Sequence, residues 1–334
     1  MKTETKTGGT NLVMLIAAFA AVYIIWGSTY LAIKYAIGTI PSFLMGGVRF
    51  STAGIILLIW ARLSPGYQRP KAVHVRTALI VGFLLLALGN GGVVIAEQYL
   101  SSSLTALLIA TVPFWIVLLG WGFMGTGRPK LKVALGLLVG FAGVALLVLG
   151  SPEAGDGGGH SQLFGILSLL VATVGWAVGS LYGSRAESAK PNILGAGMQM
   201  LAGGVMLMVM SLIRGEWSTF DVRAVSSTSW FALAYLIVFG ALVAYTCYNW
   251  LLQNASPSAV STYAYINPAI AVVLGWSIAG ESLTGVMLLG AAIIVGSVVL
   301  ITLENKKKKT VTEESEIDTS NTPASGTRPA AATA

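Results

Sequence analysis

The chain has 334 residues, of which 55% are apolar and only 10% are charged, with a formal net charge of +7. An average soluble domain carries about 25% charged residues, and the long apolar runs here show no polar faces at helical spacing, so a soluble helical protein is disfavoured. The single cysteine, Cys247, excludes an internal disulfide and any cysteine-type metal spacing.

Apolar runs of about the length of a membrane helix, roughly 18 residues or more, follow one another along the chain. The first comes after a polar segment, residues 1–11, and ends near residue 33. The others cover approximately 41–61, 77–98, 101–123, 132–150, 162–183, 192–213, 229–252, 257–279 and 283–303. We therefore predict an all-α, polytopic membrane protein with ten transmembrane helices. Residues 304–334 cannot bury a core, and we predict a disordered tail.

Basic residues concentrate in every second connection between the predicted helices. Of the 20 Lys and Arg residues, 16 belong to this set: Lys2, Lys6, Arg62, Arg69, Lys71, Arg76, Arg128, Lys130, Lys132, Arg185, Lys190, Lys306 to Lys309 and Arg328. The other connections hold only Lys34, Arg214 and Arg223, beside five carboxylates. Because Lys and Arg mark cytoplasmic loops, we predict that both termini are cytoplasmic and that residues 151–161 form an external loop.

This topology signal accounts for the positive charge, so no nucleic-acid partner is expected. The run from Lys306 to Lys309 either contacts anionic membrane lipid or simply flanks the last helix.

The sequence is duplicated. Shifting residues 98–121 by 155 positions places them on 253–276, with eight of 24 positions identical, among them Pro113 on Pro268. A second pairing, offset by 150, joins the following residues: Trp26 with Trp176, Pro41 with Pro191, Gly47 with Gly197, and Gly54 with Gly204. The two halves, 12–150 and 162–303, then hold five helices each. An odd number inverts the second half in the membrane, the arrangement typical of secondary transporters.

Arg49 is the only basic residue near the middle of a predicted span. A charge at that depth is costly and usually faces a cavity or a partner. One reading is a positive charge that binds an anionic group of a solute. The other is structural, with the guanidinium bonded to helix carbonyls or to a helix C-terminus. The sequence leaves both readings open.

Uncharged polar and aromatic residues near mid-depth are the candidates for a solute cavity, because rings with a few amides and hydroxyls suit an amphipathic organic molecule. The alternative for each is packing between helices or an interfacial belt. The candidates are Trp26, Tyr30, Asn90, Thr111, Trp115, Trp176, Tyr245, Asn249, Tyr263, Tyr265 and Asn267. Pro113 and Pro268 each free one backbone carbonyl in a membrane helix, and we expect a kink at each as a hinge.

Several functions are disfavoured by what the sequence lacks. It has no GxxxxGK[ST] stretch for ATP phosphates. Glu97 and Glu281 fall at predicted outer ends, so no carboxylate marks a proton relay at mid-membrane. No nucleophile–base pair or metal cluster appears, so we expect no enzyme activity, cofactor or metal.

Four short motifs carry a family resemblance: WGSTY at 26–30, GVRF at 47–50, YINP at 265–268 and GESLT at 280–284. Together they resemble the EamA family of the drug/metabolite transporter superfamily, most closely its bacterial inner-membrane exporters. The resemblance implies two inverted five-helix repeats around a cavity lined mainly by helices 1, 3, 4, 6, 8 and 9. It implies a packing or dimer edge at helices 5 and 10, so a homodimer stays open. Thr126 stands where the second half has Glu281, which departs from the family pattern.

The sequence therefore predicts a secondary transporter of the cytoplasmic membrane that exports small organic metabolites or drugs by alternating access. An uncoupled, channel-like facilitator and a lipid flippase are alternatives on the same fold. The substrate and the coupling ion are left open.

Overall fold

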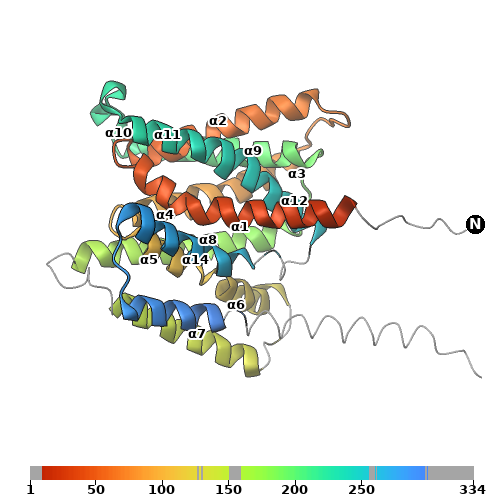
Figure 1. Cartoon of the computed structure of the whole chain (residues 1–334). Coiled ribbons are helices and arrows are strands. Elements are labelled where there is room, and N and C mark those ends of the chain that lie inside the picture. The colour runs from red at the N-terminus through yellow and green to blue at the C-terminus, as the bar shows by residue number, and fades with distance from the viewer. Residues whose placement is uncertain are drawn as a thin grey trace, which may run out of the picture.

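The computed structural model describes residues 10–125, 128, 131–149, 159–255, 260, 262–297 and 299. In this part of the chain every regular element is a helix, which confirms the predicted all-α class. The long helices lie side by side in one bundle (Figure 1). In chain order the elements are α1 (Thr10–Ala36), α2 (Ser42–Leu63), α3 (Ala72–Val81), η1 (Gly82–Asn90), α4 (Gly91–Ala96), α5 (Ser102–Ile109), α6 (Val112–Met124), α7 (Leu131–Leu149), α8 (Gly159–Gly183), α9 (Asn192–Ile213), α10 (Glu216–Thr219), η3 (Val222–Ala224), α11 (Ser227–Tyr235), η4 (Leu236–Tyr245), α12 (Thr246–Asn254) and α14 (Tyr263–Ala279).

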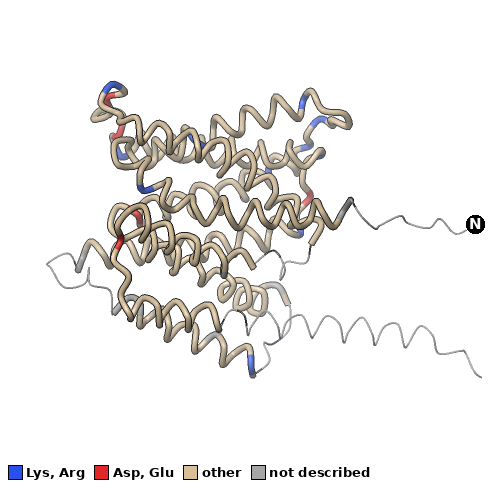
Figure 2. The backbone as a smooth tube through the Cα atoms, in the orientation of Figure 1, with Lys and Arg blue, Asp and Glu red and all other residues tan. Residues whose placement is uncertain are grey.

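Seven spans within the described residues are long and apolar enough to cross a membrane: Leu12–Ala36, Ser42–Leu63, Ala72–Ala96, Ser102–Phe123, Ser161–Gly183, Asn192–Ile213 and Ser227–Asn254. Three apolar helices are shorter: Leu131–Gly143, Ile266–Ala279 and Gly285–Ser297. Because these three apolar stretches are shorter than a crossing within the described residues, the count of ten transmembrane helices stays a prediction. Figure 2 shows the charged residues mainly at the two ends of the bundle, which leaves an apolar middle.

The third span begins at Ala72, several residues before its predicted start. His74 falls in the connection between the predicted spans 41–61 and 77–98, and the structure instead places it in α3, where its side chain is buried. Its Nδ1 accepts the Lys71 backbone N–H at 3.2 Å, and its Nε2 lies 3.0 Å from Glu187 Oε1. These polar contacts let the helix continue past the apolar region that defined the predicted span.

Helices α2 and α9 cross with their backbones in contact. A Cβ atom added at Gly54 would lie 3.0 Å from Gly197 O, and one added at Gly47 would lie 3.3 Å from Gly204 O. The later residue of α2 therefore meets the earlier residue of α9, so the two helices run antiparallel. Only glycine permits this approach, which gives the small residues of both helices a packing role.

Several backbone features recur between the two halves at the 155-residue offset. Helix α6 is followed by the C-cap residue Gly125 and α14 by the C-cap residue Gly280, both with left-handed φ angles, 64° and 65°. The π-helical segments η1 and η4 end at Asn90 and Tyr245, which also stand 155 positions apart. The sequence offered no signal for the π-helices, because a wide turn does not change the apolar composition of a span.

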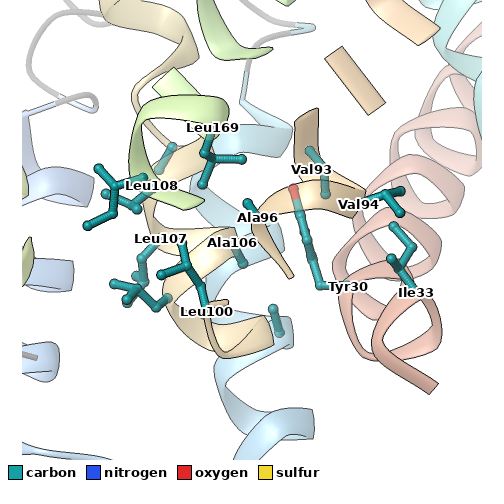
Figure 3. Close-up of a cluster of buried hydrophobic side chains, with 14 of the residues drawn as sticks. Tyr30, Ile33, Val93, Val94, Ala96, Leu100, Ala106, Leu107, Leu108 and Leu169 are labelled. Atoms are coloured by element: carbon teal, nitrogen blue, oxygen red, sulfur yellow. The ribbon is translucent and has the colours of Figure 1, made fainter. Parts of the chain in front are cut away.

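The helices at the edge of the bundle are α7 and Gly285–Ser297, which lie together in Figure 1. A Cβ atom added at Gly143 of α7 would lie 2.8 Å from Ile293 Cγ2, so these two helices also pack closely. One of the two large apolar clusters lies between α1, α4, α5 and α8. Figure 3 shows Tyr30 of α1 in this core, beside Val93 and Ala96.

Some predictions concern segments outside the described residues. They are the polar segment up to residue 9, the loop 150–158, Thr126, residues 256–259 and the tail 304–334.

Candidate functional site

A narrow cavity of about 60 Å³ lies at the centre of the bundle. This volume is below the roughly 300–1,000 Å³ of most small-molecule sites, so a solute can enter only when the lining side chains move apart. Side chains from both halves line it: Trp26, Thr29, Tyr30, Ile33, Arg49, Phe50, Gly89, Asn90, Val93, Ile109, Val112, Ala172, Trp176, Gly240, Tyr245 and Tyr263. The lining comes from the helices that the family resemblance implied, and α2 contributes as well through Arg49 and Phe50.

Aromatic rings form one wall of the cavity. The ring of Trp26 meets that of Trp176 with centroids 5.7 Å apart and that of Tyr263 at 5.4 Å, both edge to face at 84°. Tyr248 lies behind them, 4.9 Å from the Trp26 ring. Trp26 Nε1 donates to Gly240 O at 3.2 Å, which fixes the indole against η4. The wall therefore presents ring edges and faces, as suits an apolar or aromatic solute.

Arg49 brings a positive charge to the same cavity. Its side chain is only 3% exposed, and its Cζ lies 4.6 Å from the centre of the Phe50 ring. Its Nε is buried without a hydrogen-bond partner. The structural interpretation of Arg49 requires hydrogen bonds from its guanidinium to helix carbonyls. No such bond occurs within the described part of the chain.

Two hydrogen bonds close the cavity toward the end of the bundle that carries Lys190. Tyr245 OH donates to Gln199 Oε1 at 2.8 Å, and Tyr248 OH lies 3.0 Å from Ser180 Oγ. Beyond them a more open hollow is lined by Gln199, Ser180, Glu187, Lys190 and Asn249 among others. This closure is thin, because it consists of two tyrosines and their partners.

A denser cluster of polar contacts lies toward the opposite end of the bundle. Glu281 Oε1 accepts from Lys34 Nζ at 2.9 Å and from the Ser102 N–H at 2.9 Å, and Oε2 accepts from the Ser103 N–H at 3.1 Å. The hydroxyls of both serines donate to the same carboxylate. A carboxylate at the N-terminus of α5 also suits the helix dipole. The cluster joins α1 and α5 of the first half to the end of α14 in the second.

Opposing effects act on the pKa of Glu281. Burial raises the pKa of its carboxyl, but the hydrogen bonds from Ser103, Ser102 and Lys34 together outweigh burial and lower it to about 2. At neutral pH the cluster is therefore held together by a fully ionised carboxylate.

Six of the predicted solute-binding residues line this one cavity: Trp26, Tyr30, Asn90, Trp176, Tyr245 and Tyr263. Four others lie elsewhere: Thr111, Trp115, Asn249 and Asn267. The Thr111 hydroxyl donates to Leu108 O at 2.7 Å, and Trp115 packs on Phe141 of α7 at 5.6 Å. The side chain of Tyr265 lies outside the described residues.

The two asparagines have local partners. Asn249 Nδ2 donates to Tyr245 O at 3.0 Å and its side chain borders the open hollow. The Asn267 amide, turned so that its nitrogen donates, reaches Tyr263 O at 3.2 Å and Tyr23 O at 3.0 Å, which ties α14 to α1.

The two prolines differ in their setting. Pro113 is the second residue of α6, and it directly follows the turn at Ala110 and Thr111 that separates α5 from α6. The helix is therefore interrupted there rather than merely kinked. Pro268 lies inside α14.

Sequence reasoning missed Tyr248, Gln199 and Phe50. Tyr248 could have been found, because it stands three positions after Tyr245 and so shares its helix face. Gln199 stands 150 positions after Arg49 and is therefore its repeat mate, but a single amide in an apolar span is a weak signal. Within the described residues no group of His, Cys, Asp and Glu could hold a metal ion.

Comparison with known proteins gives a consistent result. The model of the EamA-like transporter family matches residues 12–149 and 163–303. The chain is 40% identical over 295 residues to "Uncharacterized inner membrane transporter YedA" of Escherichia coli (strain K12), covering 88% of this chain and 92% of that protein. It is 29% identical over 297 residues to "Uncharacterized transporter YvbV" of Bacillus subtilis (strain 168), covering 88% and 93%.

A solved crystal structure shares the fold. It superposes with a TM-score of 0.63 at 20% identity, covering 88% of this chain and 98% of that chain.

Proposed function

Because the chain belongs to the EamA-like transporter family, within the drug/metabolite transporter superfamily, we propose that it exports small organic metabolites or drugs across the cytoplasmic membrane by alternating access. It is a multi-pass membrane protein, and its Escherichia coli relative is named an inner membrane transporter. The observation that carries the proposal is the central cavity, which is lined from both halves. The Tyr245–Gln199 hydrogen bond borders it on one side, and the Glu281 cluster lies toward the other end of the bundle.

The proposed architecture is ten transmembrane helices in two inverted five-helix repeats. Gly47 and Gly54 of α2 are the repeat mates of Gly197 and Gly204 of α9, and Gly54 contacts Gly197 while Gly47 contacts Gly204. If each glycine in these two contacts is replaced by its repeat mate, the same two contacts result. A two-fold axis between the helices would produce this pattern. Equivalent helices that run antiparallel support an inverted rather than a parallel repeat.

The proposed transport cycle alternates the two closures. Loss of the Tyr245–Gln199 and Tyr248–Ser180 hydrogen bonds would join the cavity to the hollow beside Lys190. Release of Glu281 from Lys34 and the two serines would open the opposite end. The Glu281 cluster joins residues of the first half to the second, so rocking of one half against the other would act on it directly. The two tyrosine hydrogen bonds join helices within the second half, so their loss would require α8 and α9 to move away from η4 and α12.

The proposed orientation places the Lys71 and Lys190 end in the cytoplasm, together with both termini. It is tested by labelling single cysteines, introduced in a Cys247→Ala background, with an impermeant thiol reagent in intact cells. Asp221→Cys should react from outside, whereas Lys71→Cys should react only after the membrane is permeabilised. The opposite pattern would overturn the orientation and with it the outward direction.

The transport proposal is tested by metabolite profiling of cells and medium, with and without overexpression, followed by efflux from liposomes that contain the purified chain. Replacing Trp26 or Trp176 with alanine removes part of the cavity wall and should abolish efflux of any solute that the wild type exports. The control is Trp276→Ala, because Trp276 is 59% exposed on the outside of the bundle.

The kinetics separate this proposal from its rivals. A carrier saturates and shows counterflow, whereas a channel-like facilitator shows neither. A flippase would move a labelled lipid between leaflets, and no soluble solute would be needed. Liposomes with the wild-type chain that move no solute of a broad panel faster than empty liposomes would overturn the proposal.

A further inference from the structure

The guanidinium of Arg49 is a buried cation whose partner is missing from the described part of the chain. The side chain is 3% exposed and lines the central cavity, its Nε has no hydrogen-bond partner, and it takes part in no ion pair among the described residues. A buried charge normally has a paired and hydrogen-bonded partner. The structure therefore leaves most of the donor capacity of this arginine free for another group.

The surroundings compensate the charge only in part. The Phe50 ring lies 4.6 Å from Cζ, within the range of a cation–π contact. Glu97, in the turn after α4, interacts electrostatically with Arg49, but the two side chains form no ion pair. Lys34 forms an ion pair with Glu281, so it does not compete with Arg49 for an anionic group in the cavity.

The backbone next to Arg49 is arranged to admit the guanidinium into the cavity. A Cβ atom at Gly240 in the π-helical segment η4 would lie 2.8 Å from Arg49 Nη2. The carbonyl of Gly240 already accepts the Trp26 indole N–H at 3.2 Å. The missing side chain of Gly240 thus makes room for the planar guanidinium, while the Gly240 carbonyl is hydrogen-bonded to Trp26.

A guanidinium and a set of aromatic rings line one cavity. Arg49 offers paired N–H donors whose geometry matches a carboxylate. Trp26, Trp176 and Tyr263 offer ring surfaces to the same space. A solute that satisfies both carries an anionic oxygen pair and a ring.

We propose that the central cavity takes small aromatic carboxylates, with the carboxylate on Arg49 and the ring against Trp26 and Trp176. The inference rests on the proposed transport function, because it names the class of solute that the cavity carries. It assigns to Arg49 the role of binding solute rather than of stabilising the bundle.

The test compares three probes that share one ring and differ in charge: phenylacetate, phenylacetamide and phenylethylammonium. Binding of each labelled probe to the purified full chain in detergent is measured at pH 7.5, followed by efflux from liposomes. We expect phenylacetate to bind at least about tenfold more tightly than the neutral amide, since a charge-assisted bidentate contact exceeds a neutral hydrogen bond by that order. The cation should bind most weakly.

Two substitutions separate binding from folding. Arg49→Gln should reduce phenylacetate affinity to that of phenylacetamide while leaving the affinity for phenylacetamide unchanged, which also shows that the variant is folded. Arg49→Lys keeps the charge but loses the planar fork, so an intermediate affinity is expected. The matched control is Arg214→Gln, because Arg214 also stacks on a ring, that of Phe43 at 5.5 Å, but lies outside the cavity.

The outcomes are distinct from those of the transport test. Equal binding of the three probes, a preference for the cation, or unchanged phenylacetate binding in Arg49→Gln would each overturn the anion inference, even if the chain transports other solutes. Binding of none of the three would overturn it as well. Failure of the whole efflux panel, despite phenylacetate binding that depends on Arg49, would instead overturn the transport function alone.

Discussion

The ring of Trp26 meets the ring of Trp176 edge to face, with centroids 5.7 Å apart, and the two tryptophans are repeat mates separated by 150 positions. Each comes from the first long helix of its half. This aromatic contact between the halves thus joins equivalent residues, as the proposed two-fold relationship between the halves would require. Neither half contains this wall by itself.

Loss of this contact should be measurable as an interaction energy. We expect Trp26→Leu and Trp176→Leu, combined in one chain, to destabilise by about 0.5–1.5 kcal/mol less than the sum of the single variants, the usual worth of an edge-to-face pair. Thermal unfolding of the purified protein measures this. Trp26→Leu combined with Trp276→Leu is the control pair and should be additive, whereas additivity of the first pair would contradict the contact.

Close packing of α2 on α9 predicts a strict requirement for glycine at position 54. An alanine Cβ there would lie 2.6 Å from Leu201 N, which is backbone and cannot rotate away. We expect Gly54→Ala to destabilise the fold by about 1–3 kcal/mol, the usual cost of overpacking. Gly122→Ala is the matched control, because nothing lies within 4 Å of a Cβ at that helical position. A lower melting temperature for both variants alike would argue against the close crossing.

The cluster around Glu281 predicts a defined pH dependence. Its folded-state pKa of about 2 lies below the ordinary value of 4.5, so the stabilisation is complete above pH 4.5 and is lost as the pH falls from there through about 2. Glu281→Gln should lower stability by about 1–3 kcal/mol at pH 7, the cost of losing hydrogen bonds to a charged group.

Melting temperatures of the wild type and Glu281→Gln check this. Their difference should be constant between pH 5.5 and 8 and should shrink below pH 4.5. Asp221→Asn removes an exposed carboxylate with a contact inside its own turn, to the Arg223 N–H, and controls for the change of net charge. A difference that changed between pH 6 and 8 would refute the assignment.

The hydrogen bond from Tyr245 to Gln199 predicts control of access to the cavity. Tyr245→Phe removes a buried hydrogen bond worth about 1 kcal/mol and should raise the open fraction on that side about fivefold. A cysteine at position 29, in a Cys247→Ala background, reports access because Thr29 lines the cavity. Its labelling from the Lys190 side should accelerate accordingly.

Tyr99→Phe removes a hydroxyl from a partly exposed tyrosine that packs on Phe164, away from this closure, and should leave the labelling rate unchanged. An equal rate in Tyr245→Phe and the wild type would show that the tyrosine does not close the cavity.

Much of the fold could be predicted because the bilayer restricts the choices. Long apolar runs become helices when no water is present to satisfy the backbone, and the starts of α2 and α9 follow Pro41 and Pro191 as expected. The start of α3 was missed since His74 and its polar partners resemble a loop in the sequence.

The candidate site could be predicted only in part. Rings such as Trp26 and Trp176 stand out in a membrane span, whereas Tyr248 and Gln199 are ordinary residues until η4, α8 and α9 bring them together. Trp115 and Asn267 are also aromatic or polar residues within predicted spans, but their side chains contact neighbouring helices. Which face of an apolar helix meets the cavity is decided by packing, and a span that is apolar on all sides gives no periodic signal for it.

The amino-acid order alone determined the helical class, the duplication and the membership of a transporter family, since these follow from hydropathy and from residues that recur at a constant offset. Only the tertiary structure decided that Arg49 lacks a partner within the described chain, that Glu281 joins the two halves, and that Trp26 meets Trp176. Each of these depends on distances between residues far apart in the chain, and those distances arise only when the helices pack.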